Sequence, residues 1–97
     1  MLTHIVMWKY HTDTPVHSRQ EHVSRLRALA GVIPEVESLE VGFDVLHLAR
    51  SYDTGLVAKF RDRAGLDAYN VHTDHVAVAE LGRSLSAHIV SVDFESE

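Results

Sequence analysis

Hydrophobic and polar residues alternate along the first segment of the chain. Residues 3–10 (THIVMWKY) are rich in β-branched and aromatic side chains, which is typical of a β-strand. Successive side chains of a strand point to opposite faces of a sheet. One face of this strand would carry four side chains, namely His4, Val6, Trp8 and Tyr10. The other face would carry Ile5 and Met7.

A helix is predicted to follow this strand. Thr14 is suited to cap the helix and Pro15 to occupy its first position. Apolar residues then recur at helical spacing and form a stripe, with polar residues around the rest of the helix. The stripe consists of Val16, Val23, Leu26, Leu29, Ala30 and Ile33. Gly31 and Pro34 are expected to end the helix.

The rest of the chain predicts three more strands and a second, interrupted helix. The strands are expected at Val36–Val45, Thr54–Phe60 and Ile89–Phe94. Asp62 can cap a helical segment that contains Tyr69. The tract Val71–Thr73 is expected to interrupt this segment before a further helix at Asp74–Leu85.

The order of these elements is strand, helix, strand, strand, helix, strand. It predicts an α+β fold of the ferredoxin-like sandwich kind, with a four-stranded antiparallel sheet and the helices on one face. At 97 residues, the chain is long enough for one core and too short for two. We therefore expect a single domain over residues 1–97.

The sheet face that the helices leave open is expected to be apolar. We place eight large side chains on it: Ile5, Met7, Leu39, Val41, Val57, Val90, Val92 and Phe94. Monomers avoid an exposed apolar patch of this size. A second copy packed sheet to sheet is the simplest cover, so we expect a homodimer in the form of a dimeric α+β barrel.

Composition narrows the range of functions. The net charge is −5, without a cluster of Lys and Arg, so we expect no nucleic-acid binding. No apolar segment approaches the length of a membrane span, and the first ten residues do not resemble a signal peptide. The chain has no cysteine, which suits a cytoplasmic protein. We expect no membrane association, a cytoplasmic location and no bound cofactor.

The candidate chemistry lies in the segment AYNVHTDH and in the first strand. Tyr69, His72 and His75 are spaced three residues apart, which on a helical segment puts them on roughly one face. With His4, they could bring a phenol and imidazoles to one point. A histidine titrates near neutral pH and a phenol can donate a hydrogen bond, so proton transfer to and from a carbonyl or enol is the chemistry indicated.

Other interpretations of these residues remain open. His72 can instead cap the break between two helical pieces, and His4 can be a core histidine with its hydrogen bonds satisfied. Asp93 could orient a pocket histidine, but a solvated strand end is the simpler interpretation. His72 and His75 lack a defined third ligand, so we expect no metal site. The other histidines are interpreted as solvated: His11, His17, His22, His47 and His88.

Five segments together resemble the Dabb family of stress-responsive dimeric α/β-barrel proteins. They are the early His4, IPEVESLEVGFDV, SYDTGLVAKF, LDAYNVHTDH and VSVDFE, and the resemblance covers essentially the whole chain. It implies a ferredoxin-like protomer in a sheet-to-sheet homodimer. One branch, similar to the plant olivetolic acid cyclase, closes a linear polyketide by aldol condensation in a pocket between sheet and helices.

Similarity to that branch implies a role for three residues. His75 matches the catalytic histidine, Tyr69 the tyrosine that positions the substrate, and His4 a pocket histidine. Two positions depart from the branch, with Leu26 in place of a tyrosine and Thr54 in place of a histidine. The resemblance therefore implies a smaller or more apolar substrate. The expected pocket lining is Val6, Trp8, Val23, Leu26, Thr54, Leu56 and His72.

Two functions follow from the sequence. The first is a small-molecule-binding and catalytic dimeric barrel that acts on a carbonyl or polyketide-like substrate by His/Tyr acid-base chemistry, as a cyclase or lyase. The alternative is a non-enzymatic stress-response protein that acts through a very stable homodimer. An enclosed pocket at His75 and Tyr69 would favour the first, and side chains filling that space would favour the second.

Overall fold

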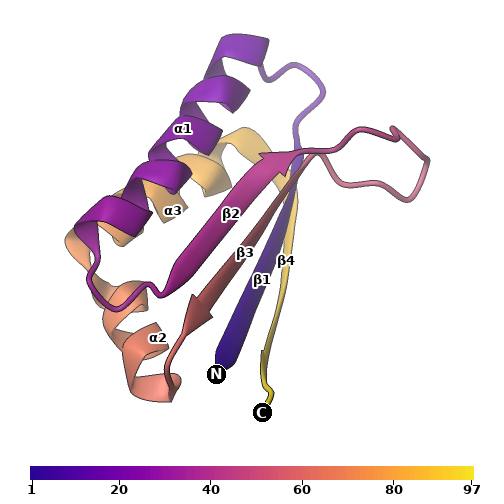
Figure 1. Ribbon diagram of the computed structural model, residues 1–97. Helices are drawn as coiled ribbons and strands as arrows, with labels where there is room; N and C mark the ends of the chain where they lie inside the picture. The colour runs from indigo at the N-terminus through magenta and orange to yellow at the C-terminus, as the bar shows by residue number, and fades with distance from the viewer.

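The fold is a single antiparallel sheet with three helices on one face (Figure 1). The computed structural model describes residues 1–97. Its elements in chain order are β1 (Leu2–Tyr10), α1 (Val16–Val32), β2 (Ser38–Phe43), β3 (Thr54–Phe60), α2 (Arg63–Val71), α3 (Thr73–Leu85) and β4 (Ser86–Glu95). The strand order is β2-β3-β1-β4, and each neighbouring pair is antiparallel. The predicted ferredoxin-like α+β fold is confirmed.

The predicted break in the second helix is present, but the predicted start of the first helix is wrong. Asp62 caps α2 by accepting a hydrogen bond from the Gly65 amide at 3.0 Å. Thr14 does not cap α1, because its hydroxyl donates to the Leu85 carbonyl at 2.9 Å and so ties the chain before α1 to the end of α3. Pro15 occupies the capping position instead, without a side-chain hydrogen bond. Gly31 lies inside α1, which continues to Val32.

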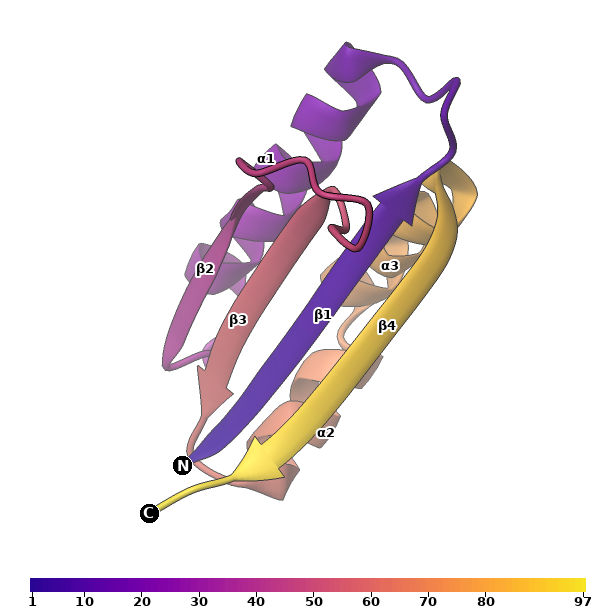
Figure 2. The same cartoon turned by 90° about the vertical axis from the view of Figure 1, so that its right-hand side faces the viewer.

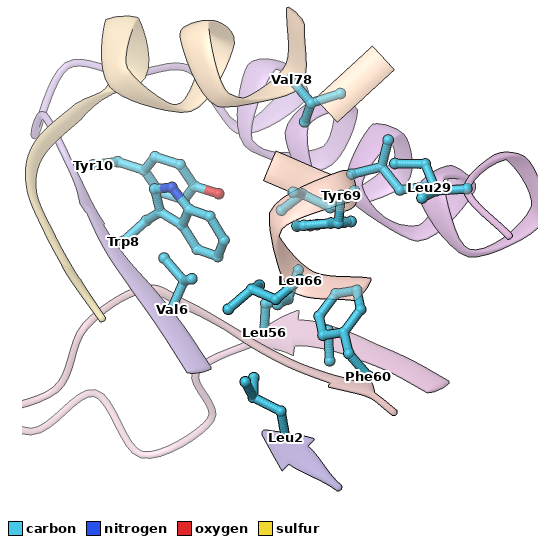
Figure 3. Close-up of a cluster of buried hydrophobic side chains, with 13 residues drawn as sticks. Leu2, Val6, Trp8, Tyr10, Leu29, Leu56, Phe60, Leu66, Tyr69 and Val78 are labelled. Atoms are coloured by element: carbon cyan, nitrogen blue, oxygen red, sulfur yellow. The ribbon is translucent and has the colours of Figure 1, made fainter. Parts of the chain in front are cut away.

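The core fills the space between the helices and the covered face of the sheet (Figure 3). It joins 13 buried residues. From the sheet they are Leu2, Val6, Trp8, Tyr10, Leu56, Ala58 and Phe60, and from the helical side Leu26, Leu29, Ile33, Leu66, Tyr69 and Val78. β1 and β3 supply the centre of the sheet, so their inward side chains are almost fully buried. Burial of this apolar surface is the main stabilising contribution to the fold.

The opposite face of the sheet is open to solvent (Figure 2). In the strand register Ile5 pairs with Val57 and Val92, and Met7 pairs with Val90, so the predicted apolar patch forms across β3, β1 and β4. It remains substantially exposed, with Val92 at 54%. The assignment of two further side chains to this patch, Leu39 and Val41, is wrong.

Leu39 and Val41 lie on the covered face. They pair with the buried residues Ala58 and Leu56, and they pack against the core under α1. The alternation in β2 identifies two faces of the strand but does not reveal which one meets the helices. Only the pairing with β3 decides that, since paired residues share a face.

A buried polar chain crosses the core near the end of β1. The Thr54 hydroxyl donates to the Tyr10 hydroxyl at 2.9 Å, and the Tyr10 hydroxyl is hydrogen-bonded to Nδ1 of His22 at 2.8 Å. His22 is 0% exposed, so the prediction that it is solvated is wrong. Its Nε2 has no protein partner and faces Gly82 on α3, where a Cβ would lie only 2.9 Å away. The glycine is therefore what allows α3 to approach this imidazole.

Candidate functional site

Three aromatic side chains from three elements meet near the junction of α2 and α3. The ring centroids of Tyr69 and His75 are 4.3 Å apart, and those of Tyr69 and His4 are 5.9 Å apart. His4 reaches this point from the covered face of β1, and Phe60 packs against both His4 and Tyr69. The structure thus brings together the three residues predicted to be catalytic.

The break at His72 is what lets Tyr69 and His75 meet. In one continuous helix, residues six apart lie about 120° apart around the axis, so these rings would not face each other. His72 has extended backbone angles, donates its amide to the Tyr69 carbonyl at 3.2 Å and accepts the Asp74 amide on Nδ1 at 3.1 Å. It therefore ends α2 and begins α3. This capping role was one of the two interpretations left open for His72.

Burial sets the protonation states of the Tyr69 and His75 pair. It raises the pKa of Tyr69 to about 12, so the phenol keeps its proton and can act as a donor at neutral pH. Burial also lowers the pKa of His75, and the hydrogen bond to the Asn70 carbonyl only partly opposes this. His75 is therefore a neutral imidazole near pH 7. The phenol can therefore donate a hydrogen bond, and the neutral imidazole can accept a proton.

The hydrogen bonds also fix which imidazole nitrogens are free. His75 Nδ1 lies 3.1 Å from the Asn70 carbonyl oxygen, which can only accept, so Nδ1 carries the proton and Nε2 keeps its lone pair. His4 Nδ1 hydrogen-bonds to the Asp93 carboxylate across the β1–β4 ladder. Asp93 orients the His4 ring in the same way that carboxylates orient histidines in other sites.

Asp93 was not among the predicted site residues. The register pairs His4 with Asp93 directly, so a correct alignment of the first and last strands would have revealed the contact. The contact agrees with the alternative left open for Asp93, that it orients a histidine, rather than with a solvated strand end. Its side chain is 38% exposed, yet one oxygen is held by His4.

A cavity of about 360 Å³ adjoins this cluster between α2 and the end of β4. Asp93 and Asn70 both line it, and these two residues are the hydrogen-bond partners of His4 and His75. The remaining lining is mixed, with Leu2 and Leu66 beside Arg63 and Glu95. None of the five cavities in the structure is lined by Tyr69 or His75 themselves.

Most of the side chains expected to line a pocket are buried in the interior, although Thr54 also borders a cavity on the open side of the sheet. Four belong to the apolar core: Val6, Trp8, Leu26 and Leu56. Val23 is buried on α1, and Thr54 is engaged with the Tyr10 hydroxyl. No three His, Asp or Glu side chains gather in a way that could hold a metal ion. None of the helices is both long and apolar enough to cross a membrane.

The fold and the site together define an α+β ferredoxin-like protein with a cluster of two histidines and a tyrosine on the helix-covered side of its sheet, in which Tyr69 and His4 are buried and His75 is partly buried. The family model of the stress-responsive A/B barrel domain, Dabb, matches residues 2–96. The chain therefore belongs to the Dabb family, as the sequence motifs predicted. No curated protein matches the sequence.

Three solved structures illustrate the range of its fold relatives. A dimeric ferredoxin-like protein of unknown function from Thermobifida fusca is 26% identical, with TM-score 0.89 and 98% and 90% of the two chains covered. A dimeric ferredoxin-like protein of unknown function from Jannaschia is 27% identical, with TM-score 0.84 and 98% of each chain covered. A hydroxynitrile lyase from Passiflora edulis is 15% identical, with TM-score 0.86 over 96% and 90% of the chains, which shows a shared fold alone.

Proposed function

We propose that this protein is a homodimer in which Tyr69, His75 and His4 bind a small carbonyl-containing molecule and transfer protons to and from it. The observation that carries this proposal is the contact between the Tyr69 and His75 rings, 4.3 Å between centroids, with the phenol buried and the imidazole partly buried. A cyclase or lyase reaction on a carbonyl or polyketide-like substrate suits these groups. The hydroxynitrile lyase from Passiflora edulis, which shares the fold, is itself a lyase.

Each residue has a distinct role in this proposal. His75 Nε2 takes the acidic proton next to the carbonyl, because Nδ1 is committed to the Asn70 carbonyl. Tyr69 keeps its proton and donates a hydrogen bond to the carbonyl oxygen, which stabilises the negative charge that develops there. His4, oriented by Asp93, contacts the substrate from the sheet side. The substrate enters through the cavity that Asp93 and Asn70 line.

The homodimer is supported by the open sheet face and by the relatives. Val92 is 54% exposed at the centre of β4 and pairs with Ile5. The Thermobifida fusca and Jannaschia proteins are described as dimeric. We expect a dimer in sedimentation experiments at micromolar concentration, and Val92→Asp should convert it to a monomer by placing a charge in the apolar interface. A folded, soluble wild-type monomer at that concentration would refute the dimer.

Ligand binding and turnover test the chemical role. A thermal-shift or crystal-soaking screen would use aromatic, β-keto and hydroxynitrile compounds, and any hit would be followed with variants. His75→Ala should abolish turnover while the fold and the oligomeric state are retained. Tyr69→Phe should lower turnover roughly 10²-fold, as expected for removal of one oxyanion donor. His17→Ala, which changes an exposed histidine on α1, is the matched control and should leave turnover unchanged.

A second function is favoured by a different observation. The space between helices and sheet is filled by the core, and no cavity reaches Tyr69 or His75 in the protomer. A non-enzymatic stress-response protein that acts through a stable dimer would need no such cavity. If the ligand screen finds binding only away from α2 and α3, or if turnover survives His75→Ala, this second function is the correct one.

A further inference from the structure

The loop between β2 and β3, residues 44–53, stands in front of the open sheet face. Figure 1 shows it projecting on the side away from the helices, and Figure 2 shows it crossing in front of β3 and β1. Three of its side chains are apolar and exposed, with Val45 at 82%, Leu46 at 68% and Leu48 at 40%. A surface loop normally presents polar side chains at its tip, so this composition indicates a contact.

Hydrogen bonds hold the loop in a defined shape. The Asp44 carboxylate accepts the His47 amide at 2.6 Å, and the Ser51 hydroxyl accepts the Leu48 amide at 3.1 Å. His47 adopts a left-handed conformation with φ 54°, which turns the chain back towards the sheet. At its base the Asp53 amide donates to the Trp8 carbonyl at 2.9 Å. The apolar side chains are thus presented by a fixed loop.

A hollow of about 610 Å³ lies between this loop and the sheet. Gly42 of β2 and Gly55 of β3 are paired across the sheet, and a Cβ on either would meet nothing within 4 Å. Met7 forms the wall towards β1, and Leu46 and Leu48 form the wall towards the loop. The missing side chains of the two glycines therefore leave an apolar recess at one end of the open face.

We propose that this loop is an arm of the dimer interface, with Val45 and Leu46 buried against a second copy of the chain and the hollow occupied by side chains of that copy. The inference rests on the homodimer proposed above. Met7 belongs both to the hollow and to the open apolar face, so the two surfaces are continuous. In a twofold dimer a patch meets its own equivalent, and a projecting loop beside a recess supplies complementary shapes.

Two aspartate variants separate this inference from the dimer itself. Val45→Asp places a charge on an exposed loop side chain, so it leaves the protomer fold intact, and we expect it to weaken dimerisation at least ~10-fold in Kd by sedimentation. Val71→Asp, at a residue of α2 that is 76% exposed, is the control and should leave Kd unchanged. Val92→Asp, measured in the same way, tests whether the sheet face itself forms the dimer.

Thiol labelling gives an independent readout, because the chain contains no cysteine. A single Val45→Cys variant should react with a maleimide more slowly at protein concentrations above the Kd of the dimer than at concentrations below it. Val71→Cys should react equally fast at both concentrations. If Val92→Asp alone weakens the dimer, or Val45→Cys reacts at one rate throughout, the loop is not part of the interface although the dimer stands. If the wild type is monomeric, both proposals fail.

Discussion

Two glycines in the last turns of their helices should respond to alanine with opposite signs. Gly82 of α3 and Gly31 of α1 both lie within helices, and neither has a positive φ. Alanine is favoured over glycine in a helix by up to about 1 kcal/mol, so propensity alone predicts that both substitutions stabilise. Their surroundings differ, because a Cβ at Gly31 meets nothing within 4 Å.

At Gly82 a new methyl group would collide with two buried rings. Its Cβ would lie 2.9 Å from Nε2 of His22 and 2.9 Å from Nε1 of Trp8. Both side chains are packed in the interior and cannot swing aside. Overpacking of this kind typically costs about 1–3 kcal/mol, which exceeds the propensity gain. We therefore expect Gly82→Ala to destabilise by up to about 2 kcal/mol, and Gly31→Ala to stabilise by about 0.5–1 kcal/mol.

Urea unfolding of the two variants at one protein concentration measures this difference, with the single tryptophan, Trp8, as a fluorescent reporter. Gly82→Ala should also shift the emission of Trp8, whereas Gly31→Ala should not. Combining Gly82→Ala with His22→Ala should recover part of the loss, because removal of the imidazole makes room for the methyl group. If Gly82→Ala proves as stable as Gly31→Ala, the close approach of α3 to His22 is incorrect.

Four further outcomes are expected. Burial lowers the pKa of His22 to about 4. The free energy of unfolding should therefore be full above pH 6.5 and should fall by on the order of 3 kcal/mol as the pH drops towards 4, because the unfolded chain takes up a proton that the folded chain does not. Urea titrations should show a shallower fall for His22→Gln. Turnover should increase as the pH rises through the pKa of His75, which burial lowers below 6.5, because the neutral imidazole is the active form. A pH-rate profile in which this increase occurs above pH 6.5 would contradict the prediction. Removing the junction cap with His72→Ala should cost about 1 kcal/mol and impair turnover, whereas an unchanged melting temperature would argue against the cap. Asp62→Ala should cost about 1 kcal/mol of unfolding free energy, and Asp62→Asn, which keeps an acceptor, should cost less.

The sequence was informative wherever the relevant interactions are local. The prediction for β3, Thr54–Phe60, matches the structure, because alternation and β-branched composition are properties of that segment alone. The capping of α2 by Asp62 is equally local. The convergence of Tyr69 and His75 was expected from three-residue spacing on a helix, but the helix break at His72 produces it.

The errors have their origin in tertiary contacts. His22 lies among polar neighbours in sequence, yet it is buried because Tyr10, on a strand 12 residues earlier, supplies its hydrogen bond. Thr14 resembles a helix cap, but its hydroxyl donates its hydrogen bond to a carbonyl 71 residues away. The choice of face for Leu39 and Val41 depended on β3. In each case a partner distant in sequence overrode the local pattern.

The alternation of β1 has an evolutionary consequence. Its even-numbered side chains, such as His4, belong to the interior, and its odd-numbered neighbours Ile5 and Met7 belong to the outer patch. Substitutions can therefore change the outer surface and the interior independently, one position at a time. A deletion or insertion of a single residue within β1 would exchange the two sets of side chains at once. Length variation between relatives should thus be confined to the loops, while β1 itself keeps its length.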